Sequence, residues 1–109
     1  MKKTKNHIVL CGDSIFDNGS YVWGEPDVAE QVREQLSDSK VTLLAKDGNV
    51  TKDVKDQLNN LPDDATHIFI SIGGNDGIDR MDVFDQGVKT IGDAMSPLYK
   101  MRQKFENIY

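Results

Sequence analysis

A serine that follows a buried strand is the residue of this chain best placed to act as a nucleophile. Ser14 lies in the segment Gly-Asp-Ser-Ile-Phe-Asp at residues 12–17, directly after the apolar residues 8–11. The strand holds the backbone rigidly, and Gly12 lets the chain turn tightly without a Cβ clash. We expect a helix to begin here, and its free N–H groups and positive dipole end can stabilise a developing anion. These residues predict nucleophilic acyl-transfer chemistry at Ser14.

Two more polar segments follow apolar runs in the same way. Residues 71–76 read Ser-Ile-Gly-Gly-Asn-Asp and follow a strand-like run that begins at His67. Residues 46–51 read Lys-Asp-Gly-Asn-Val-Thr and follow the run over residues 41–45. Each of the three segments therefore comes just after a predicted strand. In proteins whose strands alternate with helices, functional loops lie at these positions.

Together the three segments resemble signature blocks of the SGNH, or GDSL-type, hydrolases. Residues 12–17 are similar to the first block and residues 73–76 to the Gly-x-Asn-Asp block, while Gly48 occupies the place of the lone-glycine block. The first and third matches are fairly specific in combination, whereas Gly48 alone is a weak signal. The resemblance covers roughly residues 7–80 and implies a serine ester hydrolase that acts on a small acyl ester or acetylated sugar without a cofactor or metal.

The resemblance also implies a role for each site residue. Ser14 is the catalytic nucleophile, and the oxyanion donors are the backbone N–H groups of Ser14 and Gly48 and the side-chain amide of Asn75. Asp13 and Asp17 are supporting residues that order the nucleophile turn. An asparagine supplies a neutral donor that cannot ionise and compete with the oxyanion. Removing one such donor typically slows a reaction roughly 100- to 1,000-fold.

Each of these residues also has a purely structural interpretation. Ser14 or Asp13 could cap a helix, Gly48 could be a turn glycine, and Asn75 could form an Asx turn before Asp76. The agreement of three blocks favours the catalytic interpretation. We expect Asp17, Asp76 and Asp79 to be loop or cap carboxylates.

The general base of the family is missing from this sequence. The fourth block of the family is an Asp-x-x-His near the C-terminus, and the only histidines here are His7 and His67, each at the start of a predicted strand. A strand of five or six residues spans about 17–20 Å, so neither histidine is expected to reach Ser14 at the other end of the sheet. We therefore expect this chain by itself to be nearly inactive toward esters.

Two explanations for the missing block are open. The chain is either a fragment of a longer hydrolase or a complete protein that has lost the reaction. We favour the fragment because the alternation of strands and helices stops after a helix whose apolar face would normally pack against a further part of the sheet. The family has a five-stranded sheet in the order 2-1-3-4-5, of which only 2-1-3 would be present. The third strand, with Phe69, would then be an edge, and we expect self-association through it.

Apolar runs alternate with helical patterns along the chain. Strands are expected over residues 7–11, 41–45 and 67–72. This alternation predicts an α/β fold, a three-layer open parallel sheet of the flavodoxin-like, SGNH-hydrolase type with only the first three strands present. The ligand crevice of such sheets lies beyond the carboxyl ends of the strands, where all three blocks fall. We expect a flexible tail over residues 1–6 and a single domain over residues 7–109.

The helices are expected to begin at recognisable caps. Asp27 precedes a helix with a glutamate three residues later, in capping-box spacing. Thr51 is a plausible cap for a second helix, which Pro62 ends. After Asp79 the pattern changes to one long helix, in which Ser96-Pro97 marks a kink or a new cap.

Composition excludes several classes of function. The chain has 109 residues and a net charge of −5, which argues against a nucleic-acid partner. The basic N-terminus lacks the apolar segment of a secretory signal, and no stretch is long enough to cross a bilayer. The single Cys11 cannot form an internal disulfide. We therefore predict a cytoplasmic protein with a small-molecule substrate and neither a nucleic-acid nor a membrane partner.

Two other functions remain as alternatives. One is a non-catalytic α/β module that binds a small ligand in the same crevice. The other, less favoured, is a metal-dependent phosphohydrolase, whose motifs residues 12–17 and 74–76 superficially match. A dinuclear phosphatase site needs several more histidine and aspartate ligands than this chain offers.

Overall fold

The chain folds into two compact units, one that extends to Ile72 and one over Gly73–Tyr109. The structure, a computed structural model, describes residues 5–109. Most of the tail predicted over residues 1–6 therefore lies outside the described residues. The single domain expected over residues 7–109 stays a prediction.

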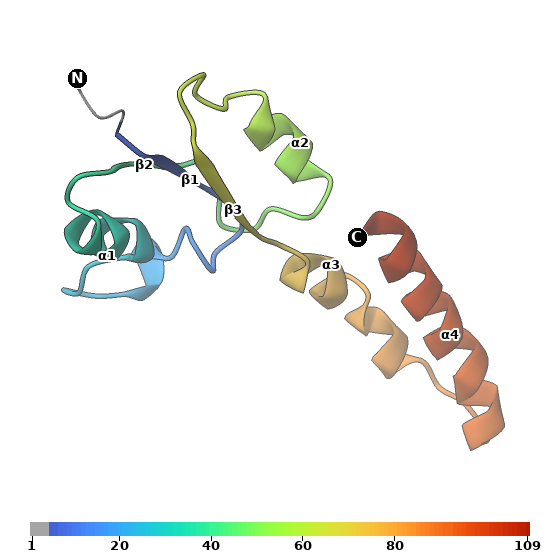
Figure 1. The fold of residues 1–109 in the computed structure, drawn as a ribbon. Helices are drawn as coiled ribbons and strands as arrows, with labels where there is room; N and C mark the ends of the chain where they lie inside the picture. The colour runs from blue at the N-terminus through green and yellow to red at the C-terminus, as the bar shows by residue number, and fades with distance from the viewer. Residues whose placement is uncertain (1–4) are drawn as a thin grey trace. The chain divides into compact units, whose positions relative to one another are not determined.

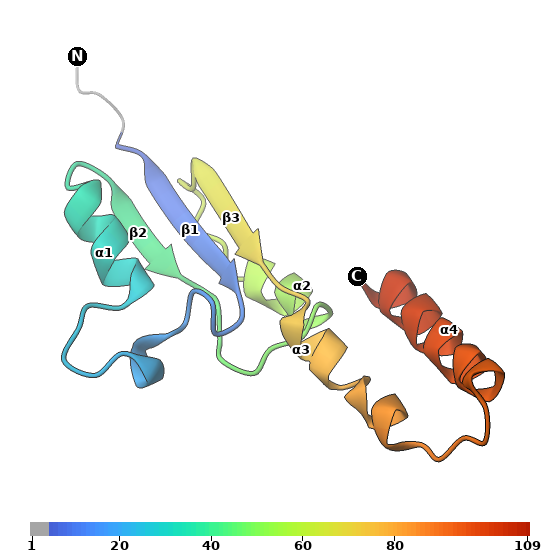
Figure 2. The ribbon, with the colours of Figure 1, turned by 90° about the horizontal axis from the view of Figure 1, so that it is seen from below.

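The first unit is built on a parallel sheet of three strands. The order is β2 (Lys40–Leu43), β1 (His7–Gly12), β3 (His67–Ser71), with β1 in the centre. Both pairings are parallel, and Ile8 lies opposite Val41 on one side and His67 on the other. Figure 2 shows the three strands side by side with their arrowheads at the same end. The predicted order 2-1-3 is confirmed.

Helices cover both faces of this sheet. Helix α1 (Val28–Gln35) packs against β2, and helix α2 (Asp53–Leu58) packs against β1 from the opposite face (Figure 1). Ile8 and Leu10 project toward α1, since alternate residues of a strand share a face, and they form the buried core with Ala29. The three-layer α/β architecture is therefore confirmed.

The central and edge strands differ in burial. All six residues of β1 are buried, because the strand has a neighbour on each side and a helix on each face. The third strand is an edge, and Ile68, Phe69 and Ile70 are 44%, 52% and 52% exposed. Self-association through this strand stays a prediction.

Two helix starts test the expected caps. Asp27 is the N-cap of α1, and its Oδ1 accepts a hydrogen bond from the Glu30 N–H at 2.9 Å, which confirms that cap. The expected Thr51 cap of α2 is wrong, because Lys52 occupies the N-cap position and Thr51 lies in the preceding turn. The helix also ends earlier than expected, at Leu58 rather than at Pro62.

The second unit contains three short or medium helices. They are α3 (Gly74–Ile78), the 3₁₀ helix η2 (Met81–Asp85) and α4 (Ile91–Ile108). The expectation of one long helix directly after Asp79 is therefore wrong, because η2 comes before α4. The backbone becomes extended at Gln86, and a loop separates η2 from α4.

A local cap explains where α4 begins. The Thr90 hydroxyl accepts a hydrogen bond from the Asp93 N–H at 3.1 Å, which satisfies one of the free donors of the first turn. Gly87 lies in the preceding loop, where its low helix propensity favours the break. Pro97 lies inside α4, so it does not start a new helix. Within the described residues, no helix combines the length and apolarity that a membrane span requires.

Candidate functional site

The turn that carries Ser14 is fixed where β1 ends against β3. Gly12 has φ +129°, and a Cβ at this position would lie 1.8 Å from the carbonyl oxygen of Ser71. The same oxygen accepts a hydrogen bond from the Asp13 N–H at 3.2 Å. Only glycine allows this conformation and this close approach. The backbone that leads into Ser14 is therefore held against the neighbouring strand.

Asp13 organises the turn through its side chain and its carbonyl group. Its side chain is buried, and Oδ1 accepts a hydrogen bond from the Ile15 N–H at 3.1 Å. Its carbonyl oxygen accepts from the N–H groups of Phe16 and Asp17 at 3.2 and 3.0 Å. This Asx-type turn leaves Ser14 at its partly exposed tip.

The helix expected to begin at Ser14 does not form. Residues 13–17 close a single turn through the bond from Asp17 to Asp13, and the first α-helix begins only at Val28. The Asp13 carboxylate bonds the nearby Ile15 N–H, and such local bonds compete with helix formation. An oxyanion at Ser14 would therefore depend on individual N–H donors rather than on a helix dipole.

The Gly48 loop is tied to the Ser14 turn by a carboxylate. Asp17 Oδ2 accepts a hydrogen bond from the Asp47 N–H at 2.7 Å, and Asp47 Oδ2 accepts from the Tyr21 hydroxyl at 2.8 Å. This hydrogen bond and the charge of Asp47 raise the pKa of Tyr21 above its usual value. The structure therefore brings the first two sequence blocks together at the carboxyl ends of β1 and β2.

Two backbone donors at this edge are available. Gly48 has φ +88° and no atom within 4 Å of the position where a Cβ would stand, so it faces open space. Across residues 5–109, no protein acceptor is hydrogen-bonded to the backbone N–H of Ser14 or of Gly48. These are the two backbone groups that the sequence predicts as oxyanion donors.

Gln57, which was not predicted as a site residue, is a buried side chain behind the site. It is 7% exposed; its Nε2 donates to the Gly12 carbonyl oxygen at 2.7 Å, and the Gly12 N–H donates to its Oε1 at 2.8 Å. Nε2 also donates to Asn49 Oδ1 at 2.8 Å. A signal was present, because Gln57 is a polar residue three positions after Val54 on the apolar face of α2.

Asn75 lies in the second unit, in helix α3. Gly73 precedes the helix with φ +118°, and Asp76 beside Asn75 is 5% exposed. Asp76 is therefore a buried residue in the first turn of a helix rather than a loop residue, whereas Asp79 is the C-cap of α3. The part of Asn75 in an oxyanion site stays a prediction.

Both histidines start strands, as predicted. His67 begins β3, and His7 begins β1 at the end opposite Ser14. His7 is buried, with Nδ1 2.7 Å from Asp64 Oδ1 and Nε2 2.7 Å from Thr42 Oγ1. The hydrogen bond to His7, followed by one to a lysine, lowers the pKa of Asp64 below its usual value. His7 therefore links β1 to β2 and to the loop before β3, and it is not directed at the site.

Across residues 5–109, no three or more histidine, cysteine, aspartate or glutamate side chains are grouped so that they could hold a metal ion. The one cysteine, Cys11, is fully buried, and burial raises the pKa of its thiol. A buried thiol of this kind behaves as a small apolar residue.

Comparison with known proteins gives a fold-level result. No protein-family model and no curated protein matches the sequence. Solved structures of AlinE4, described as an SGNH-hydrolase family esterase, and of two of its point mutants are similar, with a TM-score of 0.59 and 16% identity. The similarity covers 98% of this chain and 56% of AlinE4. The chain thus has an α/β fold like that of AlinE4, and it spans a little over half of that protein's length.

Proposed function

We propose that this chain is the N-terminal part of an SGNH-type serine ester hydrolase with Ser14 as its nucleophile. The N–H groups of Ser14 and Gly48 and the side-chain amide of Asn75 are the proposed oxyanion donors. The observation that carries the proposal is the hydrogen bond from the Asp47 N–H to the Asp17 carboxylate, which holds the Ser14 turn beside the Gly48 loop. The fold similarity to an esterase supports the same class of reaction.

In this proposal, Ser14 Oγ attacks the carbonyl carbon of the ester and loses its proton to a base. The negative charge that develops on the carbonyl oxygen is stabilised by the backbone N–H groups of Ser14 and Gly48. The intermediate then expels the alcohol, which takes up a proton, and leaves an acyl group on Ser14. Water attacks this acyl-enzyme, releases the acid and restores the serine.

The base for the first step is not one of the histidines of this chain. His7 begins β1 and is bonded to Asp64 and Thr42, whereas Ser14 follows the other end of the same strand. A six-residue strand separates the two by about 20 Å. We therefore propose that the 109-residue chain alone reacts slowly. In the serine protease subtilisin, loss of the triad base lowers kcat on the order of a million-fold.

The charges at the site favour a neutral substrate. The carboxylates of Asp17 and Asp47 lie in the two loops that form the proposed oxyanion site. A negatively charged acyl or alcohol group would be repelled by them. We therefore propose small, uncharged acyl esters as the substrate class.

Imidazole added to the solution can test this proposal by replacing the missing base. We expect it to accelerate hydrolysis of an uncharged activated aryl ester by the natural chain more than by Ser14→Ala, with the difference growing with imidazole concentration. Ser20→Ala is the matched control, because Ser20 is an exposed serine of the same unit, and it should behave like the natural chain. Equal rates for the natural chain and Ser14→Ala at every concentration would contradict Ser14 as nucleophile.

A further inference from the structure

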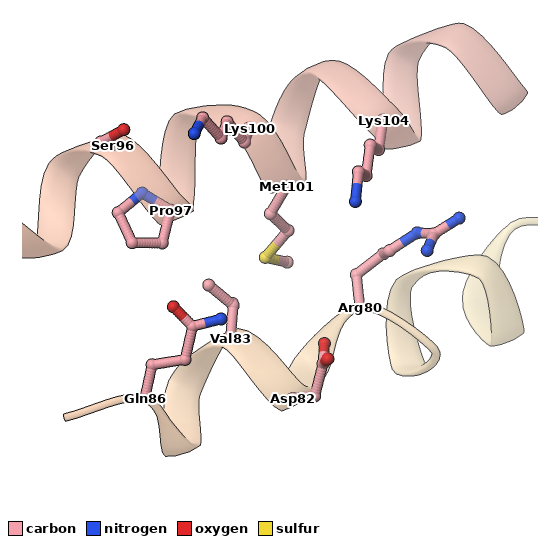
Figure 3. A pocket seen from close by; sticks show the side chains of 9 residues that line it. All are labelled: Arg80, Asp82, Val83, Gln86, Ser96, Pro97, Lys100, Met101 and Lys104. Carbon is pink, nitrogen blue, oxygen red and sulfur yellow. The ribbon is translucent and has the colours of Figure 1, made fainter.

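A cavity within the second unit carries an unusual concentration of positive charge. It has a volume of about 320 Å³ and lies between α4 and the segment over residues 80–86 (Figure 3). Its charged lining residues are Arg80, Lys100, Lys104 and Asp82, three cations and one anion. This local excess of positive charge occurs in a chain whose net charge is −5.

Arg80 is the residue of this cavity that most clearly favours an anionic ligand. Its Nε is buried and has no hydrogen-bond partner, the only such side-chain atom found among residues 5–109. Figure 3 shows the guanidinium of Arg80 and the ammonium of Lys104 extending into the gap from opposite sides. A buried charged donor without an acceptor is costly, and an anion in the cavity would remove that cost.

The two lysines provide an independent observation. Lys100 and Lys104 are one turn apart on α4, and like charges at this spacing repel each other. Neither belongs to any of the ion pairs found across residues 5–109. Arg102 on the same helix, by contrast, has its Nε 2.9 Å from Glu106 Oε1. The helix therefore neutralises its other cation but leaves these two facing the cavity.

We propose that this cavity is a binding site for a phosphomonoester dianion. A phosphomonoester carries a charge near −2 at neutral pH and three strong acceptor oxygens. The planar guanidinium of Arg80 can bind two of them, while Lys100 and Lys104 add point charges. The three cations and Asp82 leave an excess of two positive charges, which matches the dianion. Val83 and Met101 offer an apolar surface to a small organic group on the ester oxygen.

The test is an NMR titration of the whole 109-residue chain with methyl phosphate. We expect saturable shifts of the backbone amides of residues 80–86 and 96–104. Arg80→Gln and Lys104→Gln should each weaken binding at least fivefold, and Arg80→Lys should weaken it by less than Arg80→Gln. Arg102→Gln removes a cation of the same helix that does not line the cavity. The affinity of this variant for methyl phosphate should therefore stay within twofold of that of the natural chain.

Two further binding measurements can overturn the proposal. Acetate, a monoanion, should bind at least tenfold more weakly than methyl phosphate, and equal binding would overturn the assignment of a dianion. Lys104 is exposed, so Lys104→Gln keeps the fold even if Arg80→Gln does not. Unchanged affinity in Lys104→Gln, or a loss in Arg102→Gln as large as in Lys104→Gln, would overturn the site. Ser14→Ala should bind methyl phosphate normally, because the site is independent of the proposed hydrolase.

Discussion

The side-chain amide of Gln57 is hydrogen-bonded to both the backbone N–H and the carbonyl oxygen of Gly12, and it also donates to Asn49. Gly12 leads into Ser14, and Asn49 follows Gly48, so a single buried side chain joins the two loops of the proposed site. Helix α2 thereby has a second function beyond covering the sheet, since it sets the position of both loops from behind. The Asp17–Asp47 bond fixes the same two loops from the solvent side.

Replacing Gln57 should destabilise the first unit strongly. In Gln57→Leu the buried N–H of Gly12 loses its acceptor and the Asn49 side chain loses a donor, which should lower the free energy of unfolding by about 2–4 kcal/mol. Urea unfolding followed by circular dichroism measures this change. Gln35→Leu is the matched control, because Gln35 is exposed on α1 and its replacement should cost less than about 0.5 kcal/mol. Similar midpoints for the two variants would contradict the role given to Gln57.

Two glycines with positive φ should respond very differently to alanine. In Gly12→Ala the new Cβ meets the Ser71 carbonyl oxygen at 1.8 Å, so we expect a loss of about 4 kcal/mol or more, or failure to fold. In Gly48→Ala no atom lies within 4 Å, so only the strain of φ +88° remains, about 1–2 kcal/mol. Urea midpoints of the two variants provide the comparison. A larger loss in Gly48→Ala would show that the loop is packed and not open.

The sheet and its order were predictable because their signals are local or follow general topology. Apolar runs mark the buried strands, and parallel strands place their carboxyl ends at one edge. Asp27 was predictable as a cap because its hydrogen bond reaches only three residues along the chain. The same local logic places Ser14 and Gly48 in loops after two of these strands, and their catalytic roles stay a prediction.

The errors arose where a long-range contact or a competing local bond decides the structure. No helix begins at Ser14 because the Asp13 side chain bonds the turn locally. The long helix expected after Asp79 breaks before Thr90, which supplies a cap of its own. Gln57 was missed because the apolar face of α2 shows a polar residue there but does not reveal its partner Gly12, which lies 45 residues away in the sequence.

The carboxylate of Asp64 should give the chain a pH-dependent stability. Its pKa is lowered by hydrogen bonds from His7 and Lys40, so its contribution is fully present above its ordinary value of 3.8 and is lost as the pH falls through the lower folded value. The difference in urea midpoint between the natural chain and Asp64→Asn should therefore be clear at pH 5 and shrink below pH 3. Asp63→Asn, one residue earlier in the same loop, should show no such difference at either pH. A gap that widens toward low pH would have the wrong sign.

The exposed edge strand β3 should cause self-association. Ile68 and Ile70 are 44% and 52% exposed on an edge whose backbone groups are open to a further strand, and such edges pair with other chains. Sedimentation velocity should show dimers that increase with protein concentration. A lysine at position 70 adds a charge to the edge and removes an apolar contact worth about 1.5–3 kcal/mol, so Ile70→Lys should raise the dimer dissociation constant at least about tenfold. Trp23→Lys is the control, because Trp23 is 90% exposed but lies outside the sheet. If Trp23→Lys disrupts the dimer and Ile70→Lys does not, association occurs through another surface.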